Sequence, residues 1–447
     1  MMERFSEQYR QFLDKGKTEF EVVEEVWAAA LEKGFIPYPE AYCHTQRDFV
    51  PGDRLIQNIK GKGLVMAVIG KRPVNEGTKI VSAHTDSPRL DLKPVPVQED
   101  DGMIYLRTHY YGGIKKYQWT CVPLALHGRV CDGSGNIRNI VIGENEGDTK
   151  FVITDLLPHL AEAQMSKGGD LIISGEQLKL LCGTAEKDVS GEEKTDKLLK
   201  DNFNITSADL RISEFEAVPA WKASDAGLDR SFTASYGQDD RVCVFSAVRA
   251  LMDLEEVPEY TSMVMLCDQE EVGSENGAGL YSNAYLEMLY DLAEKQNTNL
   301  YRVFAASECL AADTICGHDP LYPEATESQN TASLGKGLAL VRYTGRGGKK
   351  GNNSADTRLM TKLANIFDKN NIKWQCGEMG VCDAGGGTTV AKCMARWGAD
   401  VVDIGCPLLS MHSPLEITSK SDLYNLYLGL GAFFADSLAP WQSVINK

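Results

Sequence analysis

The chain has 447 residues, of which 43% are hydrophobic, so it is long enough for two or three domains with ordinary globular cores. Its 63 acidic and 46 basic residues give a net charge of −17, which argues against nucleic acids and acidic membranes as partners. No apolar run approaches the roughly eighteen residues of a membrane span, and the start of the chain has no apolar signal core. Twelve cysteines are scattered without Cys-x-x-Cys spacing. We therefore expect a cytoplasmic protein with reduced thiols and no membrane attachment.

The N-terminal part predicts helices and strands in alternation. Residues 18–34 have a capping box at the start and a glycine at the end, so they predict an amphipathic helix. Two apolar strands are expected at 63–70 and 79–87. The second strand ends with His84 and Asp86. Candidate metal ligands therefore lie at a strand end.

The sequence changes in character between residues 88 and 229. Short β-prone pieces such as 102–107 alternate with turns, which predicts a β-rich domain inserted into an α/β fold. Within it, residues 183–210 are rich in Lys, Glu, Asp and Ser, so we expect a mobile surface loop there. The predicted α/β domain then consists of residues 1–87 and 230–447.

After residue 230 the sequence returns to alternating helices and strands. We expect helices at 242–254, 276–295 and 419–438, and strands from Met263 onward, at 302–307, at 337–343 and at 400–405. This alternation is typical of an α/β fold built on a partly parallel sheet.

The apolar run that begins at Met263 ends abruptly in Asp268, Glu270 and Glu271. Such a run predicts a buried parallel strand, which delivers the acids to the C-terminal edge of a sheet. Carboxylates crowded there repel one another unless a cation neutralises them or one keeps a proton. A solvated turn is the alternative for an isolated Glu-Glu pair. The metal hypothesis therefore depends on further ligand candidates in similar positions.

Six residues of the predicted α/β regions are such candidates: His84, Asp239, Glu270, Glu271, Asp313 and His412. Two imidazoles with several carboxylates favour zinc, or its neighbours cobalt and manganese, over calcium or magnesium. Two divalent ions are expected, because one would not use so many ligands and still leave a position for water. Each residue alone also fits an ordinary role, such as a hydrogen-bonded histidine or, for Asp239, a helix cap.

This combination of side chains suits hydrolysis by an activated water. Two cations beside one water lower its pKa toward neutrality, and a neighbouring carboxylate accepts the proton before attack on a peptide carbonyl. Asp86 lies two residues beyond His84 and on the same face of an extended strand, where it can accept the second imidazole N–H. A surface role for Asp86 is the alternative.

The segment of three glycines and two threonines at residues 385–389 is a candidate for substrate binding. It lacks the Lys-Ser/Thr ending and the spacing of a P-loop, which argues against nucleotide binding. We expect Gly386, Gly387 and Thr388 to let the backbone approach a substrate; a simple tight turn is the alternative.

A compact basic turn at residues 346–350 is a second candidate. Because the average surface repels acidic peptides, a preference for N-terminal Asp or Glu requires a local basic group. Lys349 and Lys350 are the candidates for that group. The alternative is that they are solvated loop cations.

Six motifs resemble, in the same order and over nearly the whole chain, those of the aspartyl aminopeptidase family of dinuclear zinc exopeptidases. They are HTDSP at 84–88, QDDR at 238–241, DQEEVGS at 268–274, ADT at 312–314, DAGGGTT at 383–389 and SMHS at 410–413. The resemblance implies a catalytic α/β domain interrupted by a β-rich dimerisation domain. It also implies dimers assembled into a hollow tetrahedral dodecamer.

The resemblance further implies that Asp239 bridges two metal ions and that Glu270 is the general base. The remaining ligands would be His84 and Asp313 for one ion, and Glu271 and His412 for the other. In the resembling family a lysine near the basic turn meets the substrate carboxylate.

We therefore predict a metal-dependent aminopeptidase that removes N-terminal residues, with Asp or Glu as candidate preferences, from peptides. A deacylase or carboxypeptidase with the same two-metal site is the alternative among enzymes. A non-catalytic assembly protein with a dead site is the alternative from another class, and it is less favoured because the base and every ligand candidate are present.

Overall fold

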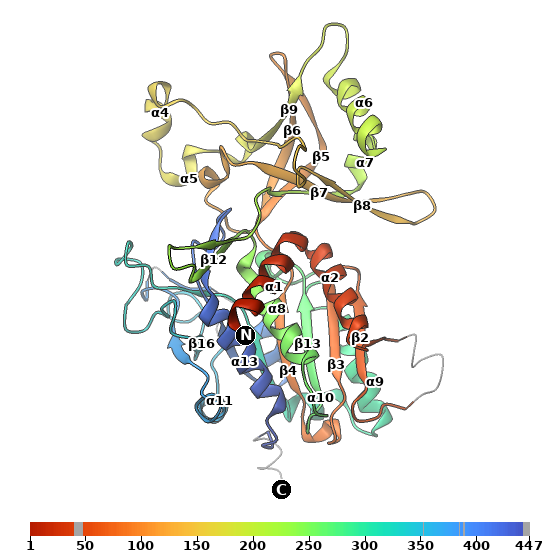
Figure 1. The fold of residues 1–447 in the computed structure, drawn as a ribbon, viewed down its shortest axis with the longest axis vertical. Coiled ribbons are helices and arrows are strands. Elements are labelled where there is room, and N and C mark those ends of the chain that lie inside the picture. The colour runs from red at the N-terminus through yellow and green to blue at the C-terminus, as the bar shows by residue number, and fades with distance from the viewer. Residues whose placement is uncertain (40–47, 352, 384, 388, 441–447) are drawn as a thin grey trace. The chain divides into compact units, whose positions relative to one another are not determined.

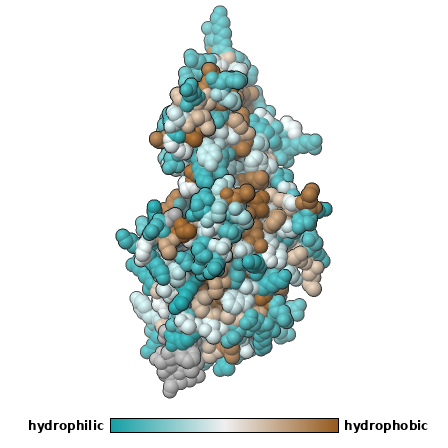
Figure 2. All heavy atoms as spheres, turned by 90° about the vertical axis from the view of Figure 1, so that its left-hand side faces the viewer, coloured by the Kyte–Doolittle hydropathy of each residue, from teal (hydrophilic) through white to brown (hydrophobic). Residues whose placement is uncertain are grey.

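The computed structural model describes residues 1–39, 48–351, 353–383, 385–387 and 389–440 (Figure 1). The chain forms two compact units. The first comprises Met1–Asp86, Ala223–Met411 and Glu416–Lys447, and the second comprises Ser87–Lys222 and His412–Leu415. Among the described helices, none is long and apolar enough to cross a membrane. Hydrophilic side chains predominate on the face shown in Figure 2, with hydrophobic ones in small groups among them.

The first unit contains a nine-stranded mixed sheet. Its strands, in spatial order, are β1 (Ile36–Pro37), β2 (Arg54–Ile59), β3 (Gly63–Val68), β13 (Ser262–Cys267), β4 (Lys79–His84), β14 (Glu308–Ala312), β18 (Asp400–Gly405), β16 (Leu338–Val341) and β17 (Trp374–Gly377). Strands β13, β4, β14 and β18 are parallel to one another, whereas β3 and β16 run antiparallel to their neighbours in this group. The parallel strands at the centre therefore end at the same edge.

The central strand β13 is buried on both faces. Val264 and Leu266 belong to one hydrophobic cluster, and Met263, Met265 and Cys267 belong to a second cluster. This alternation follows from the two-residue period of a strand. It also explains why β13 is continuously apolar, since both faces of the sheet are covered.

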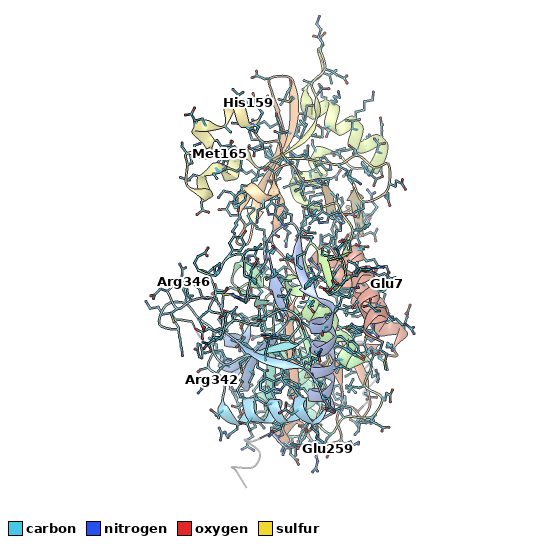
Figure 3. All side chains as sticks on the ribbon, turned by 60° about the vertical axis from the view of Figure 1, so that its left-hand side comes forward. Glu7, His159, Met165, Glu259, Arg342 and Arg346 are labelled. Atoms are coloured by element: carbon cyan, nitrogen blue, oxygen red, sulfur yellow. The ribbon has the colours of Figure 1, made fainter. Side chains whose placement is uncertain are left out.

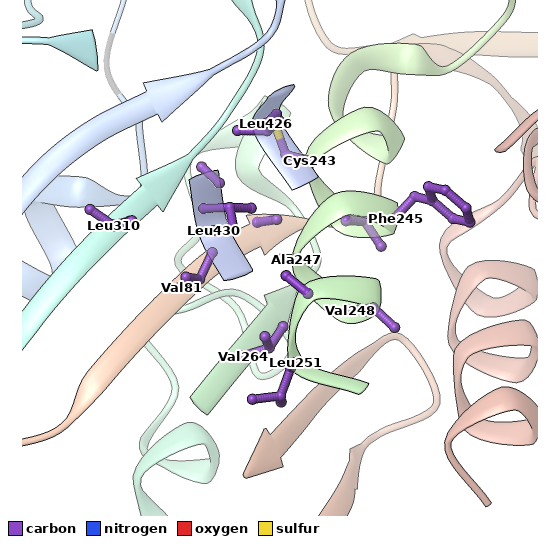
Figure 4. Close-up of a cluster of buried hydrophobic side chains, with 14 of the residues drawn as sticks. Val81, Cys243, Phe245, Ala247, Val248, Leu251, Val264, Leu310, Leu426 and Leu430 are labelled. Atoms are coloured by element: carbon purple, nitrogen blue, oxygen red, sulfur yellow. The ribbon is translucent and has the colours of Figure 1, made fainter. Parts of the chain in front are cut away.

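Helices cover the two faces of this sheet. The first cluster takes side chains from α1 (Met2–Lys15), α2 (Glu19–Glu32), α8 (Gln238–Met252), α11 (Thr357–Lys369) and α13 (Lys420–Ala435). The second takes them from α9 (Glu287–Lys295), α10 (Leu300–Ala305) and α12 (Ala391–Trp397). Figure 4 shows part of the first cluster, where Val81 and Val264 of the sheet lie near Ala247 and Leu251 of α8.

A smaller sheet in the first unit joins β11 (Ser224–Ala226), β12 (Phe232–Ser235), β20 (Glu416–Ser419), β19 (Pro407–Leu409) and β15 (Ile315–Cys316). The short turns η1 (Val74–Glu76), η5 (Glu270–Val272) and η6 (Asn283–Leu286) complete this unit.

The second unit contains a six-stranded antiparallel sheet. Its order is β8 (Ile137–Ile142), β7 (Leu124–Cys131), β10 (Glu214–Pro219), β5 (Arg89–Asp100), β6 (Met103–Tyr111) and β9 (Lys179–Thr184). Its helices are α4 (Glu162–Met165), α5 (Gly169–Ile172), α6 (Gly191–Phe203) and α7 (Ser207–Ile212), with the turns η2 (Lys116–Trp119), η3 (Pro158–Leu160) and η4 (Gly175–Gln177). The prediction of an α/β fold with a β-rich insertion is confirmed.

The prediction of a mobile loop over 183–210 is wrong. Residues Gly191–Phe203 form α6, which begins with a capping box between Ser190 and Glu193 and ends at Asn204 in the left-handed conformation. Thr195 and Leu199 are buried. The charged composition concealed an amphipathic helix whose start and stop signals are both present.

Two further elements differ from the predictions. Residues 302–307, predicted as a strand, lie mostly in helix α10, because the side chain of Asn299 accepts a hydrogen bond from the backbone N–H of Arg302 and caps a helix. The helix predicted over 276–295 begins only at Glu287. Before it, the Asn276 side chain accepts hydrogen bonds from two successive backbone N–H groups and forms a turn instead.

Candidate metal centre and active site

The sheet register brings His84 and the two glutamates to one edge. His84 is the last residue of β4 and pairs with Cys267, the last residue of β13. The chain then turns at Gln269, which is in the left-handed conformation, and Glu270 and Glu271 begin the η5 turn. The acids predicted at a strand end therefore lie in a turn directly after that strand.

Asp86 connects these two strand ends. Its side chain is fully buried, and its two carboxylate oxygens accept hydrogen bonds from the backbone N–H groups of Glu270 (3.2 Å) and Glu271 (3.3 Å). Nδ1 of His84 lies 3.0 Å from the carbonyl oxygen of Asp86 and 3.3 Å from its Oδ1. These contacts orient the imidazole so that Nε2 is the nitrogen available to a metal.

Asp239 enters the site at the start of α8. Its backbone N–H donates to the buried carboxylate of Glu416 on β20 over 3.1 Å. The next residue, Asp240, is joined to it by a cis peptide bond and accepts a hydrogen bond from the backbone N–H of His84 over 3.1 Å. The start of the helix is thus fixed to β4 and β20.

Asp313 directly follows β14, and its backbone N–H donates to the carbonyl of Ile404 on β18 over 3.0 Å. Gly405 lies so close that a Cβ atom there would be 1.7 Å from the carbonyl oxygen of Asp313. Any side chain at position 405 would therefore displace the segment that carries Asp313.

The side chains converge on one point. Nε2 of His84 lies 3.4 Å from Oδ1 of Asp239 and 3.5 Å from Oδ1 of Asp313. Three overlapping groups have potential ligand atoms within 4.8 Å of one another: His84 with Asp239 and Glu271, His84 with Glu270 and Asp313, and Asp239 with Asp240 and Asp313. Five of the six residues proposed as ligands or base are thus brought together.

The electrostatics of this cluster favour a cation. Burial raises the pKa of Glu270 to about 8, and the negative charges of Asp313, Asp86 and Asp239 add to this effect. Burial also raises the pKa values of Asp240 and Asp313. For His84, burial alone would lower the pKa, but its hydrogen bonds with the surrounding carboxylates raise it well above its usual range.

Crowded buried carboxylates raise one another's pKa because their charges are not balanced. Divalent cations balance such charges, and one imidazole with several carboxylates suits zinc and its first-row neighbours. The donor set therefore fits the metal expected from the sequence.

His412 is not in these groups. It lies in the segment 412–415, which belongs to the second unit, and its Nδ1 is 2.8 Å from the carbonyl oxygen of Gly113. Its role as a metal ligand stays a prediction.

The two predicted substrate loops contact each other. The backbone N–H of Gly345 donates to the carbonyl oxygen of Gly387 over 2.8 Å. The ammonium of Lys349 lies 3.3 Å from the centre of the Tyr343 ring, and Lys350 is exposed in the same turn. Thr388, also predicted to bind substrate, lies outside the described residues.

Three residues of this region were missed as contributors. Asp240 precedes an apolar helix, where an acid also fits a helix cap, and only its buried neighbour Asp239 indicates a place in the site. Glu416 had no signal beyond its place in a β-prone segment. Asp403 lies in the middle of a predicted buried strand, where an acid requires partners.

An α/β sheet whose parallel strands deliver a histidine and several buried carboxylates to one edge is typical of metal-dependent hydrolases. The chain matches the model of the aminopeptidase I zinc metalloprotease (M18) family over residues 12–434, and it belongs to that family.

Relatives and solved structures agree with this assignment. The chain is 40% identical over 444 residues to a probable M18 family aminopeptidase 1 of Borreliella afzelii, covering 97% of this chain and 96% of the relative. The crystal structure of an M18 family aminopeptidase from Thermotoga maritima is similar with a TM-score of 0.91 at 35% identity, covering 98% and 97%. That of aminopeptidase I from Clostridium acetobutylicum has a TM-score of 0.90 at 37% identity, covering 96% and 95%.

The protein is accordingly a zinc-metallopeptidase-family aminopeptidase, a hydrolase that removes N-terminal residues from peptides. The alternatives of a deacylase, a carboxypeptidase or a non-catalytic assembly protein are not favoured.

Proposed function

We propose that this aminopeptidase works with two divalent ions, zinc by preference, and that Asp239 bridges them. His84 and Asp313 would be the other protein ligands of one ion. Glu271 and His412 would be the other protein ligands of the second ion. The observation that carries this proposal is the convergence of Asp239 and Asp313 on Nε2 of His84, at 3.4 and 3.5 Å. Zinc bound there would polarise the scissile carbonyl and lower the pKa of a water at the site.

Glu270 is proposed as the general base. Its side chain belongs to a group with His84 and Asp313, yet it is only half-buried, so a substrate can reach it. Cations at the site would lower its raised pKa and keep its carboxylate ionised near neutral pH. The carboxylate then takes a proton from the attacking water and passes it to the nitrogen of the leaving amine.

Asp86 is proposed to hold His84 and both glutamates in place. The carbonyl oxygen of Asp86 at 3.0 Å and its carboxylate at 3.3 Å both face Nδ1 of His84, and a proton held there fixes the tautomer in which Nε2 carries the lone pair. The same carboxylate accepts from the backbone of the η5 turn. One buried side chain therefore sets the positions of a ligand from each strand.

For the substrate, we propose a preference for N-terminal Asp or Glu that the basic turn provides. Lys350 is the stronger candidate, because the ammonium of Lys349 already lies on the face of the Tyr343 ring. The turn is anchored to the glycine segment, defined as Gly385–Gly387 with Thr389, through Gly345.

For assembly, we propose a homo-oligomer of dimers, up to a dodecamer, formed through the second unit. Large hydrophobic side chains are exposed along residues 156–171: Leu156, Leu157, Leu160, Met165 and Leu171 are each 50–68% exposed. Figure 3 labels Met165 and His159 on this segment. Such patches are costly on a monomer. One yeast structure of this fold, at 21% identity, is described as a dodecamer.

The test of the two-metal proposal is hydrolysis of aminoacyl-amides by protein stripped with a chelator and reloaded with zinc. Activity should disappear on stripping and return as zinc reaches two ions per chain. N-acylated amino acids and N-acylated peptides with a free C-terminus, which a deacylase and a carboxypeptidase would cleave, should not be hydrolysed. Full activity at one ion per chain would contradict the two-metal proposal.

A further inference from the structure

Asp403 is an acid in the middle of strand β18. It is 3% exposed, and the strand residues on either side of it, Val402 and Ile404, are apolar and buried. Burying a carboxylate in a sheet is unfavourable unless hydrogen bonds satisfy it. The partners of Asp403 therefore indicate why an acid occupies this position.

Both carboxylate oxygens accept hydrogen bonds from loops. Oδ1 accepts from the hydroxyl of Thr389, and Oδ2 accepts from Nδ2 of Asn353 over 3.1 Å. Thr389 ends the glycine segment, and Asn353 follows the basic turn. One side chain thus contacts both predicted substrate loops.

Asn353 closes the base of the basic turn. Its backbone carbonyl accepts from the N–H of Thr344 over 3.3 Å, and its own N–H donates to the Thr344 hydroxyl over 3.4 Å. Its Nδ2 also donates to the carbonyl of Val401 over 3.1 Å. Asn353 is 8% exposed, so the ends of the turn are fixed to β18 by a buried amide.

Thr389 fixes the other loop to the same strand. Besides donating to Asp403, its hydroxyl oxygen accepts from the backbone N–H of Ala391, at the start of α12. Further along the glycine segment, a Cβ atom at Gly386 would lie 2.5 Å from the carbonyl oxygen of Gly345 and 2.6 Å from Cα of Arg346. Only glycine allows this approach of the two backbones.

We propose that Asp403 is a positioning residue that holds the basic turn and the glycine segment together as one substrate-binding wall. This inference rests on the proposed substrate roles of the two loops. Asp403 itself would touch neither substrate nor metal. It acts through Thr389 and Asn353, and its strand also fixes Asp313, whose N–H donates to the neighbouring Ile404 carbonyl.

The ionisation of Asp403 is compatible with this role. Burial raises its pKa to about 6, against the opposing effect of the hydrogen bonds from Thr389 and Asn353. At neutral pH the group is therefore mainly a carboxylate, with both oxygens able to accept. An amide at this position would offer only one acceptor oxygen.

The test is a double-mutant cycle on zinc-loaded enzyme, with KM and kcat for an aminoacyl-amide as readouts. Thr389→Val and Asn353→Ala should each raise KM by about five- to tenfold, the scale of one lost hydrogen bond, with kcat changed less than about twofold. The double variant should raise KM little beyond either single variant. Either substitution alone already breaks the connection between the two loops, so the second has little left to disrupt. Thr389→Ser, which keeps the hydroxyl, should retain the wild-type KM.

Asp403→Asn should raise KM as the single loop variants do, and adding Thr389→Val should then change KM little. Multiplicative effects of the two loop substitutions, or an unchanged KM in them, would overturn the proposal. If Asp403→Asn does not fold, the double-mutant cycle between Thr389 and Asn353 still tests whether the two loops are held together as one wall.

Asp422 offers a matched control. It is fully buried, its pKa is raised by burial to about 6, and it accepts from the backbone N–H groups of Gly335 (2.6 Å) and Gly337 (2.7 Å). Asp422→Asn should lower the melting temperature without changing KM. A wild type that lacks metal-dependent activity would contradict the proposed function, whereas an active Asp403→Asn with unchanged KM would contradict only this inference.

Discussion

The carboxylate of Asp86 accepts a hydrogen bond from the backbone N–H of Glu270 over 3.2 Å. Its second oxygen accepts from Glu271, and the group also lies 3.3 Å from Nδ1 of His84. Because the two strands that carry these residues are parallel neighbours ending in register, one side chain between them can orient both. The geometry of the proposed metal centre therefore depends on Asp86 as much as on its ligands.

We predict that Asp86→Asn weakens zinc binding by about 10- to 100-fold, the usual cost of losing a partner behind a metal ligand. An amide can accept through only one of its two heavy atoms, so one backbone N–H of the η5 turn loses its partner. Competition with a chromophoric chelator measures the change. Asp53→Asn, at a buried carboxylate that accepts from the N–H of Val50, is the control and should bind zinc like the wild type.

The adjacent glutamates should behave differently from each other. Glu270→Gln should keep its metal and lower kcat by about 10²- to 10⁴-fold, because the base that takes the proton from water is lost. Glu271→Gln should instead lower the bound metal per chain. The two purified variants are compared by their bound metal per chain and by their kcat values. Metal loss in Glu270→Gln with retention in Glu271→Gln would reverse the assigned roles.

Much of the fold was predictable because strong local signals agreed with the tertiary structure. The capping box before α2 and the uninterrupted apolar run of β13 correspond to the observed elements. The strand at Asp400–Gly405 was predicted with its observed bounds. Long apolar runs are reliable because only a buried element can accommodate them.

The predictions of secondary structure failed where a short apolar run is compatible with either a strand or a helix. Residues 302–307 are apolar enough for a strand, and only the Asn299 cap selects a helix. Among candidate site residues, His84 ends an apolar strand and Glu271 follows one, so both could be recognised there. Asp403 could not, because its partners Asn353 and Thr389 lie 50 and 14 positions away and no local pattern joins them.

The stability of the first unit should depend on pH through Asp225. Its side chain is 9% exposed and forms ion pairs with Arg10, Arg230 and Lys420. Burial opposes its ionisation, but hydrogen bonds from Lys420 and Arg230 and the charge of Arg10 lower its pKa to about 2. Since this value is below the unfolded value of about 3.9, the stabilisation is complete above about pH 4 and is lost as the pH falls toward 2.

Asp225→Asn should therefore lower the free energy of unfolding by about 1–2 kcal/mol near pH 6, after allowance for screening by solvent. The difference from wild type should shrink as the pH falls from about 4 toward 2, because in this range the unfolded carboxyl binds a proton while the native one stays ionised. Urea titrations of both proteins at several pH values measure this difference in the free energy of unfolding. Asp201→Asn, at an exposed position on α6, controls for the loss of one negative charge. A difference that does not change with pH would contradict the prediction.

The exposed hydrophobic segment of the second unit should be needed for assembly. Leu160→Lys and Met165→Lys each place a charge on a side chain that is 66–68% exposed, so a monomer would tolerate them while a buried interface would not. Light scattering should show a smaller particle for both variants. Ile212→Lys, at an 84% exposed position outside this segment, should leave the particle mass unchanged. A wild-type monomer at micromolar concentration would contradict the proposal directly.

The basic turn should determine which N-terminal residue is preferred. Lys350→Ala should lower kcat/KM for Asp- or Glu-amides by about 1–3 kcal/mol, the scale of a charge-assisted hydrogen bond, and should spare Leu- and Ala-amides. Lys349→Ala should have the smaller effect, because the ammonium of Lys349 lies over the Tyr343 ring. Lys336→Ala, at an exposed lysine outside the turn, is the control for the loss of one positive charge.

The negative net charge of the protein makes the salt dependence of the preference for acidic amides a second test of the basic turn. At −17 the average surface repels acidic peptides, so a preference for them must come from a local cation and should weaken as salt screens it. The ratio of kcat/KM for Asp-amide to that for Leu-amide should therefore fall with ionic strength in the wild type and remain low in Lys350→Ala. Equal losses on acidic and neutral amides in both lysine variants would show that the turn does not contact the substrate side chain, and the enzyme would then be a general aminopeptidase.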